Sequence, residues 1–596
     1  MPTKGSRALT RANDGNVAST RSHLRSARTA VTASSEERRL PAWKRRDSLA
    51  LVLLVALGAA GPLVISLCFG TLGIPENDDW SYRRVATELF RTHHVVFNGF
   101  AVMTLVGQAI SVQPLLELTG GANWTYGVYG AIAAGVALAA TYCLARRFAP
   151  TSRALLAAGL VAIAPVFAVA VPTFMTDGPG LAASMTCLAV GVVALDRSGR
   201  SRWLWLSVAM AIGVFGFSIR QFCVAAPLAI IIAAVVQAPK DWGRLLALGA
   251  LVAAACEGVS RWVSGFPNAP IDQLSISSLH SGLAVGGKLG VDLGLAVLPA
   301  AIFVLMQSGE RLARLLAVCP ATFVLVLMVA GRIPGGLLAG DLLTQSGALD
   351  SIVLAGNRPT LFPGLAWSAI EAAAAIGVIS VLAIALARAI SVGKRWSPKR
   401  ALAWFASPQG VLGVFLVLSG GGLVVLTAGA DAWDRYTWPL VGPLAILLVM
   451  RVKPPAHGRR VSRAGVATVS LTSLLALVSI MEVFNVDAYD AARWQAGSAL
   501  THTGIPARYV DAGFEWFGYH QPGAWHPGAS PTLDTYTWYE YLLFSGTPVC
   551  AVVSSSPMGQ ANLVAAGVTT YRLLGTIGPT EYLYRYINPH IAACVK

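Results

Sequence analysis

The dominant pattern along the chain is a series of apolar runs separated by short polar segments. A run of about 20 apolar residues is long enough to cross the hydrocarbon core of a bilayer as a helix. We therefore expect about thirteen membrane helices. They lie at residues 48–70, 124–145, 154–172, 180–195, 203–219, 222–238, 245–262, 290–307, 315–331, 366–390, 409–429, 437–451 and 464–483.

Basic residues cluster at the end of every second run, as at Arg146-Arg147 and between Arg197 and Arg202. Because cytoplasmic loops carry an excess of Lys and Arg, this alternation predicts a cytoplasmic N-terminus and a C-terminal part outside the plasma membrane. The short apolar segment 95–110 would invert the order if it crossed the membrane. We therefore predict that residues 71–123 form one long external loop with interfacial helices.

The composition agrees with a multi-pass membrane protein. The chain is 55% hydrophobic and only 12% charged, whereas soluble domains carry about a quarter of charged residues. The formal net charge of +16 resides in short clusters between apolar runs, which argues against a nucleic-acid partner. Residues 1–47 are basic and lack a hydrophobic period, which predicts a disordered cytoplasmic tail. Residues 48–483 then form the membrane domain.

The last part of the chain, residues 484–596, has no long apolar run. Helical spacing predicts a helix at Asp487–Ala499, and aromatic and β-branched residues predict strands at Tyr509–Tyr519 and Val549–Ser554. We expect a small external α/β domain. Its two cysteines, Cys550 and Cys594, are candidates for a disulfide because that compartment is oxidising.

The first external loop opens with Asn77-Asp78-Asp79 and continues as an amphipathic segment. The apolar face follows the helix period, and the predicted polar face is basic. The apolar positions are Tyr82, Val85, Ala86, Leu89 and Phe90, and the polar ones are Arg83, Arg84, Glu88 and Arg91. An acid at a helix N-terminus is often only a cap. One side chain suffices for capping, so the second carboxylate is a candidate for chemistry.

Three further ionisable residues fall at predicted external helix ends: Asp177, Arg220 and Arg435. A carboxylate can act as general base on a hydroxyl, and an arginine fork can hold a phosphate. Structural alternatives remain open, since Asp177 can cap a helix, Arg220 can reach lipid headgroups and Asp434-Arg435 can pair two helices. The sequence contains no phosphate-binding glycine loop, HExxH or GxSxG motif.

The order of these motifs resembles the C-class (GT-C) glycosyltransferases, in particular the family 39 group of protein mannosyltransferases and aminoarabinose transferases. The motifs are the first-loop Asn77-Asp78-Asp79-Trp80-Ser81-Tyr82, the Phe174–Pro179 turn, Arg220 and Asp434-Arg435-Tyr436. The resemblance implies a polyprenyl-phosphate sugar donor used on the outer membrane face. It implies Asp78 or Asp79 as general base, Asp177 as second acid and Arg220 and Arg435 on the donor phosphate. Arg83 and Arg84 are the next candidates for contact with the donor phosphate.

The predicted function is transfer of a sugar from this donor to a cell-envelope glycan, lipid or protein. Some C-class enzymes use a divalent cation such as Mg²⁺ or Mn²⁺, for which Asp78 and Asp79 are the candidate ligands. The C-terminal part around Asp511–Trp516 does not resemble a sugar-binding trefoil, which weighs against a protein acceptor. The alternative is a multi-pass transporter or flippase of a lipid-linked solute. The chain shows no internal repeat and its candidate charges lie at helix ends, which disfavours that alternative.

Overall fold

The computed structural model describes residues 43–101, 103–269, 279–307, 311–329, 336–340, 343–349, 353–393, 397–428, 433–450, 452, 462–521, 536–544 and 547–589. The chain divides into two compact units, Met1–Ser48 and Leu49–Lys596. Most of the predicted cytoplasmic tail lies outside the described residues. The second unit contains all of the candidate site residues.

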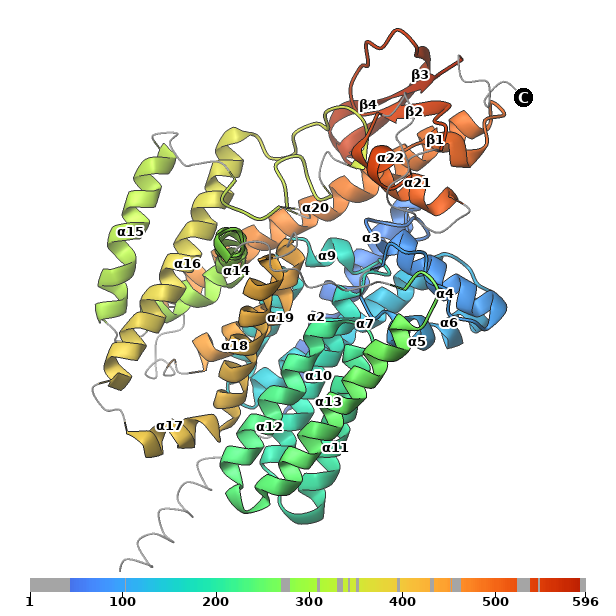
Figure 1. Ribbon diagram of the computed structural model, residues 1–596. Helices are drawn as coiled ribbons and strands as arrows, with labels where there is room; N and C mark the ends of the chain where they lie inside the picture. The colour runs from blue at the N-terminus through green and yellow to red at the C-terminus, as the bar shows by residue number, and fades with distance from the viewer. Residues whose placement is uncertain are drawn as a thin grey trace, which may run out of the picture. The chain divides into compact units, whose positions relative to one another are not determined.

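The second unit is mostly helical (Figure 1). The first helix begins in the preceding unit, and the helices of the predicted membrane domain, apart from those of the first loop, follow in chain order. They are α2 (Arg45–Val55) with η1 (Ala56–Ala60) and α3 (Gly61–Phe69), α7 (Trp124–Arg146), α8 (Thr151–Ala162), α9 (Phe167–Ala170), α10 (Asp177–Leu195), α11 (Gly199–Phe217), α12 (Ala225–Gln237), α13 (Trp242–Ser264), α14 (Leu279–Gln307), α15 (Arg311–Val329), α16 (Gly364–Gly393), α17 (Pro398–Phe405), α18 (Pro408–Thr427), α19 (Trp438–Val449) and α20 (Arg463–Thr501).

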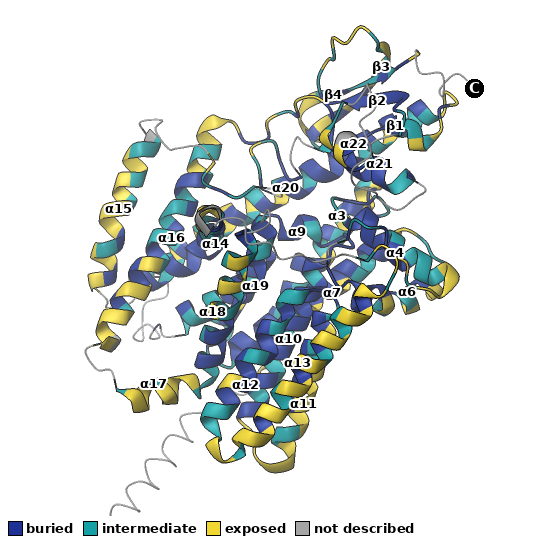
Figure 2. Cartoon of the chain, viewed as in Figure 1, coloured by how far each residue is buried: buried dark blue, intermediate teal, exposed yellow. Residues whose placement is uncertain are grey.

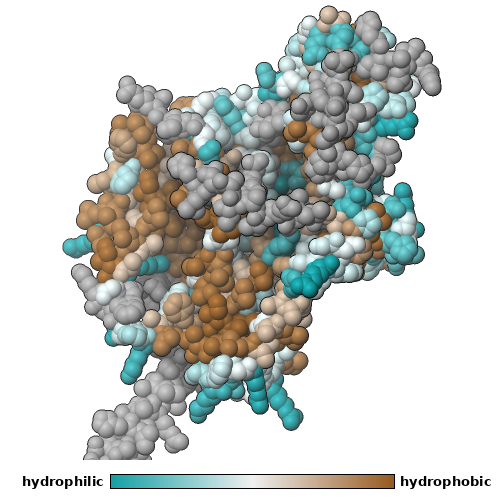
Figure 3. All heavy atoms as spheres, viewed as in Figure 1, coloured by the Kyte–Doolittle hydropathy of each residue, from teal (hydrophilic) through white to brown (hydrophobic). Residues whose placement is uncertain are grey.

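The predicted helical membrane fold is confirmed. Among the described residues, nine helices are long and apolar enough to cross a membrane. The other predicted spans coincide with α8, α11, α12 and α19, which are shorter or less apolar, so the number of crossings stays a prediction. Figure 3 shows apolar side chains gathered on the visible outer faces of the helices, with hydrophilic residues towards the ends. Exposed apolar faces of this kind suit a lipid environment.

One predicted span, residues 154–172, is wrong as a continuous helix. α8 ends at Ala162, and the short α9 begins at Phe167. Pro165 lies between them, and a proline cannot supply the backbone N–H that a continuing helix needs. The interruption lets the segment after α9 bend across the helix ends. Gly130 of α7 permits this approach, because an added Cβ would clash with the carbonyl oxygen of Thr173.

The central helices are the buried ones. Figure 2 shows mostly buried residues on α7, α10 and α12, whereas α13, α15 and α17 present exposed faces. In the most apolar stretch of 18 residues, 72% of α10 is buried, against 11% of α15. The ends of α7 and α10 are therefore fixed by packing on several sides, which gives rigid support to side chains placed there.

The first loop forms α4 (Asp79–Thr92), α5 (Val106–Ser111) and α6 (Gln113–Thr119). The predicted amphipathic helix is confirmed, since Tyr82, Val85 and Ala86 are almost fully buried. The prediction for Arg83 is wrong. Its spacing assigns it to the polar face, but it is 1% exposed because it turns back to pair with Asp79.

α20 is continuous from Arg463 to Thr501 and joins the helical part to the sheet (Figure 1). The elements that come after it are η6 (Ala507–Tyr509), β1 (Val510–Asp511), α21 (Phe514–His520), α22 (Trp538–Leu542), β2 (Ala551–Ser554), β3 (Val564–Leu574) and β4 (Ile577–Ile587). The strand order is β1-β2-β4-β3. β1 and β2 are parallel, and the other two pairs are antiparallel.

The predicted strand Val549–Ser554 is confirmed in β2, whereas the one at Tyr509–Tyr519 is wrong beyond Asp511. Gly513 has a φ of +108°, which ends the strand and allows α21 to begin. Cys550 is disulfide-bonded. Its predicted partner, Cys594, lies outside the described residues.

Candidate functional site

Four of the predicted site residues form one row of alternating charge. Asp78 precedes α4, Asp177 begins α10, Arg220 follows α11, and Arg435 lies in η5 (Asp434–Thr437). Arg435 Nη2 lies 3.1 Å from Asp78 Oδ2, and Arg435 Nε lies 4.0 Å from Asp177 Oδ2. Arg220 Nη1 lies 2.7 Å from the same Asp177 oxygen. The order is therefore Asp78, Arg435, Asp177, Arg220.

This charged row is shielded from solvent. The side chains of Asp177, Arg435 and Arg220 are 3%, 4% and 9% exposed, and that of Asp78 is the most open at 20%. Two carboxylates and two guanidinium groups balance in formal charge. An anion that enters the site therefore competes with the aspartates for the arginines.

Neighbouring polar groups orient the arginines. Arg220 donates to Thr176 Oγ1 at 2.8 Å, and its guanidinium carbon lies 4.8 Å from the ring centre of Tyr436. Burial lowers the pKa of Arg220, but the charge of Asp177 together with Tyr436 and Tyr82 raises it overall. Tyr82 Oη lies 3.5 Å from Asp78 Oδ2. Burial, followed by the charge of Asp78, raises the pKa of Tyr82 well above its usual value, so the phenol stays protonated.

Asp79 points away from this row and holds the start of α4. One carboxylate oxygen accepts from the backbone N–H of Glu76 at 2.9 Å. The other accepts from Phe174 N at 3.0 Å and from Arg83 Nη2 at 2.8 Å. Arg83 also donates to the carbonyls of Gly73 and Ile74. The geometry separates the two neighbours, because Asp78 faces the charged row and Asp79 ties the loop to the turn before α10.

Arg83 and Arg84 do not join the charged row. Arg83 is committed to Asp79, and Arg84 Nη1 lies 3.5 Å from the carbonyl oxygen of Gly518. Asp434, adjacent to Arg435, accepts from Leu343 N at 2.8 Å. Of the four arginines predicted as phosphate ligands, Arg220 and Arg435 are therefore the two that lie in the row.

The two first-loop carboxylates do not fit a shared divalent cation. Both oxygens of Asp79 are already used by N–H donors, and Asp78 faces Arg435. Within the described parts of the chain, no group of three or more His, Cys, Asp or Glu side chains is placed to hold a metal ion.

Two adjoining hollows open beside the charged row. The first is lined by the polar residues Glu76, Asn77, Thr173, Asp177 and Arg435 and by Val169, Ala170, Met175 and Leu349. The second is lined by Gly130, Ala134, Phe167, Ala170, Val171, Thr173, Met175, Gly178, Pro179 and Trp438. They share Ala170, Thr173 and Met175.

Replacing Asp79 with Asn should destabilise the fold strongly. The change leaves the Arg83 guanidinium buried without its counter-charge, and breaking a buried pair in this way costs about 3–5 kcal/mol. Thermal unfolding of the purified protein in nanodiscs measures the loss. Asp196→Asn is the control, because Asp196 also pairs with an arginine, Arg147, but lies at the end of α10 and has a side chain that is 37% exposed. That variant should change stability by no more than about 0.5 kcal/mol, and equal losses in both variants would contradict the assignment.

Glu76 is a residue that sequence reasoning missed. It is 4% exposed, and its Oε2 has no hydrogen-bond partner among the described residues. Burial raises its pKa well above the usual value, and the nearby carboxylates of Asp490, Asp487 and Asp79 add to this. The folded protein therefore holds the Glu76 proton more tightly than the unfolded chain does.

Glu76→Gln should stabilise the protein increasingly as pH rises. An unfolded glutamate titrates near pH 4.3, so the raised folded pKa makes stability fall from about that pH upward. A tenfold difference in proton affinity between the folded and unfolded states is worth about 1.4 kcal/mol, and Gln removes this loss. We expect the Tm of the variant to exceed that of the wild type at pH 8 and to approach it at pH 5. The control is Glu117→Gln, because Glu117 is exposed. A difference in Tm between Glu76→Gln and the wild type that is the same at pH 5 and pH 8 would refute the interpretation.

Comparison with known proteins supports the resemblance predicted from the motifs. Residues 111–261 match the model of the dolichyl-phosphate-mannose-protein mannosyltransferase family, which is a family of glycosyltransferases. The matched segment contains α7, α10 and α11 with Asp177 and Arg220. The predicted resemblance to the mannosyltransferase group of GT-C enzymes is thereby confirmed. No curated protein matches the sequence.

Three solved structures share distant similarity. ArnT from Cupriavidus metallidurans bound to undecaprenyl phosphate is 15% identical, with coverage of 91% of this chain and 99% of that one and a TM-score of 0.37. Its apo state has the same identity, with 91% and 98% coverage and a TM-score of 0.36. The oligosaccharyltransferase AglB from Archaeoglobus fulgidus, in complex with an inhibitory peptide and a dolichol-phosphate, is 14% identical. The match covers 81% of this chain and 62% of the AglB chain, with a TM-score of 0.38.

Proposed function

We propose that this chain is a glycosyltransferase that moves a sugar from a polyprenyl-phosphate donor to a hydroxyl group of a cell-envelope glycan, lipid or protein on the outer membrane face. The observation that carries the proposal is the alternating row of Asp78, Arg435, Asp177 and Arg220 beside two adjoining hollows. The family match over residues 111–261 supports the reaction class. The basic clusters at the opposite helix ends support a location of the site on the outer face of the membrane.

Arg435 and Arg220 are the proposed phosphate ligands. Both are buried, and both are held by aspartates that an incoming phosphate can replace. Charge-assisted bonds from guanidinium to phosphate are among the strongest in proteins. The apolar lining of the second hollow, beside α7 and α19, supports contact with the first isoprene units of the lipid.

Asp78 is the proposed general base. In the structure its Oδ2 is paired with Arg435, and donor binding would draw Arg435 onto the phosphate and release this oxygen. Asp78 then accepts the proton of the acceptor hydroxyl, whose oxygen forms a bond to the anomeric carbon of the sugar. The bond between that carbon and the phosphate oxygen breaks, and the electron pair leaves with the phosphate. A single displacement of this kind inverts the anomeric centre.

The arginines also assist the leaving group, since negative charge grows on the phosphate as that bond breaks. Preformed donors aimed at such a charge stabilise the transition state more than the ground state. Asp177 holds both arginines within 4.0 Å and fixes their orientation. Tyr82 donates a proton in a hydrogen bond to Asp78 and limits the directions in which the carboxylate can point.

The test of this function is mass spectrometry of the cell-envelope glycans and lipids of a strain that lacks the gene. Complementation with the wild-type chain should restore a sugar substituent that is absent from the deletion strain. Complementation with Asp78→Asn should not restore it, although the variant reaches the membrane in equal amount. Identical envelopes in the presence and absence of the gene would refute the proposal.

A further inference from the structure

The turn that presents Asp78 has an unusual backbone. Asn77, the preceding residue, has a φ of +52°, which lies in the left-handed region that most L-residues avoid. Its backbone N–H donates to Glu515 Oε1 at 3.0 Å. The two residues are 438 positions apart, and Glu515 belongs to α21 in the C-terminal part. A carboxylate from a distant part of the chain thus holds the peptide next to the proposed base.

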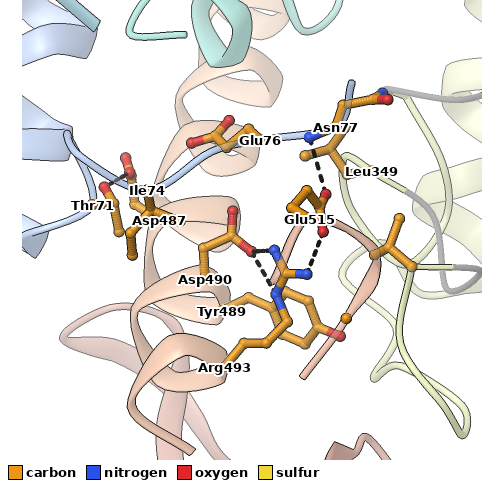
Figure 4. A network of polar contacts seen from close by, with 12 residues as sticks. Thr71, Ile74, Glu76, Asn77, Leu349, Asp487, Tyr489, Asp490, Arg493 and Glu515 are labelled. Atoms are coloured by element: carbon orange, nitrogen blue, oxygen red, sulfur yellow. Dashed lines mark hydrogen bonds and ion pairs between the residues drawn. The ribbon is translucent and has the colours of Figure 1, made fainter. Parts of the chain in front are cut away.

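Glu515 is itself fixed by a buried arginine (Figure 4). Its second oxygen forms an ion pair with Arg493 Nη1, and both side chains are 0% exposed. Arg493 of α20 also donates to Asp490 Oδ1 from Nη2 at 2.8 Å and from Nε at 3.2 Å. Burial raises the pKa of Glu515, while the charge of Arg493 opposes this. The chain of contacts runs from α20 through α21 to the backbone of Asn77.

A second contact between α21 and the first loop leaves little room for adjustment. A Cβ added to Gly518 would lie 2.5 Å from Trp80 Cε2, so the helix packs directly on the indole. Trp80 is 1% exposed. Glu515 and Gly518 are three positions apart and therefore share a face of α21. This face of α21 contacts Asn77 and Trp80, the residues that flank Asp78 and Asp79.

A merely stabilising role explains this arrangement poorly. Buried ion pairs are weak contributors to stability because desolvation offsets their attraction, and apolar replacements are often as stable. What the Glu515–Arg493 pair supplies is a fixed hydrogen-bond acceptor for the backbone N–H of Asn77. For a general base, a displacement of about 1 Å can lower the rate about 100-fold.

We propose that Glu515 and Arg493 are positioning residues for Asp78, so that the C-terminal part of the chain takes part in catalysis by holding the first loop. This inference rests on the proposed function of Asp78. Glu515 acts through the Asn77 peptide, and Arg493 acts through Glu515. Neither residue contacts the charged row in the structure, so the expected effect is on turnover and not on donor binding.

The experiment compares Glu515→Gln and Glu515→Ala with Glu540→Gln and Glu540→Ala in purified full-length protein. Glu540 is a matched control, since it is 2% exposed and also accepts backbone N–H groups, but from Tyr536 and Thr537 of its own helix start. The readouts are kcat and KM for a labelled undecaprenyl-phosphate sugar that the wild type accepts, the Kd for undecaprenyl phosphate alone, and Tm. Each rate is normalised to folded protein.

Glu515→Ala should lower kcat at least tenfold, with the Kd for undecaprenyl phosphate within twofold of the wild type. Glu515→Gln keeps an oxygen for the Asn77 N–H and should recover a large part of this loss. The Glu540 variants should lower Tm and keep kcat within twofold. If Glu515→Ala does not fold, Glu515→Asp decides the question, because its shorter side chain keeps the negative charge but withdraws the acceptor from the Asn77 N–H; it should lower kcat and keep the Kd.

A kcat for Glu515→Ala, or for Glu515→Asp if the Ala variant does not fold, equal to that of the Glu540 variants would overturn the positioning role. The proposed function would survive that result as long as Asp78→Asn is inactive. Full activity of Asp78→Asn would instead overturn the proposed function itself. A change confined to Kd would assign Glu515 to donor binding and would also contradict the inference.

Discussion

Asp78→Asn is expected to lower kcat for sugar transfer at least about 100-fold, because positioned general bases contribute about 10²- to 10⁴-fold. Asn has the size of Asp but cannot take the proton of the acceptor hydroxyl. The same change removes the carboxylate that competes with phosphate for Arg435, which lies 3.1 Å away. We therefore expect the variant to bind undecaprenyl phosphate more tightly than the wild type while it turns over more slowly.

This pair of opposite effects is measured by steady-state transfer kinetics and by lipid binding in nanodiscs. Asp196→Asn is the control, since Asp196 is also paired with an arginine, Arg147, but lies at the opposite end of α10. It should leave both quantities within about twofold, because partly exposed pairs contribute little. Loss of activity with equal loss of lipid binding would contradict the role of Asp78 as base.

Arg435→Gln is expected to lower kcat/KM for the lipid-linked donor about 100- to 1,000-fold, the range seen when one transition-state donor is removed. The guanidinium lies between Asp78 and Asp177. Its loss therefore also leaves two carboxylates that repel the phosphate. Both ground-state binding and turnover should fall, in contrast to the expected behaviour of Asp78→Asn.

Two further variants separate charge from geometry. Arg435→Lys keeps the positive charge but loses the planar fork, so we expect intermediate activity. Arg84→Gln removes a charge that lies against Gly518 and outside the charged row, and activity should remain within about threefold of the wild type. Equal losses in Arg435→Gln and Arg84→Gln would show that net charge, and not the position of Arg435, supports donor use.

The helical architecture could be predicted from the sequence because apolar runs and basic clusters are local signals. The amphipathic period predicts α4, and the positions of charges at helix ends bring Asp78, Asp177, Arg220 and Arg435 together as candidates. The structure places these four side chains in one row of ion pairs. Local periodicity could not show that Arg83 turns inward, because that orientation depends on Asp79 and on backbone carbonyls of the preceding turn.

The parts that sequence reasoning missed depend on contacts between distant segments. Glu76 gives no signal because its raised pKa depends on burial in the folded chain and on carboxylates of the distant α20. Glu515 lies within a segment interpreted as a strand, since its aromatic neighbours are typical of strands and of buried short helices alike. Pro165 is a visible signal for the break between α8 and α9, but the apolar character of residues 154–172 favours a continuous helix.

The most direct measurement of the central claim uses purified wild-type protein in nanodiscs with undecaprenyl-phosphate sugars labelled in the sugar. The proposal predicts time-dependent release of undecaprenyl phosphate together with label on an acceptor from the cell envelope, and loss of both with Asp78→Asn. In parallel, the same donors in sealed vesicles report movement of the lipid across the bilayer. Movement of the intact donor without cleavage of the sugar–phosphate bond would contradict the account and favour a transporter.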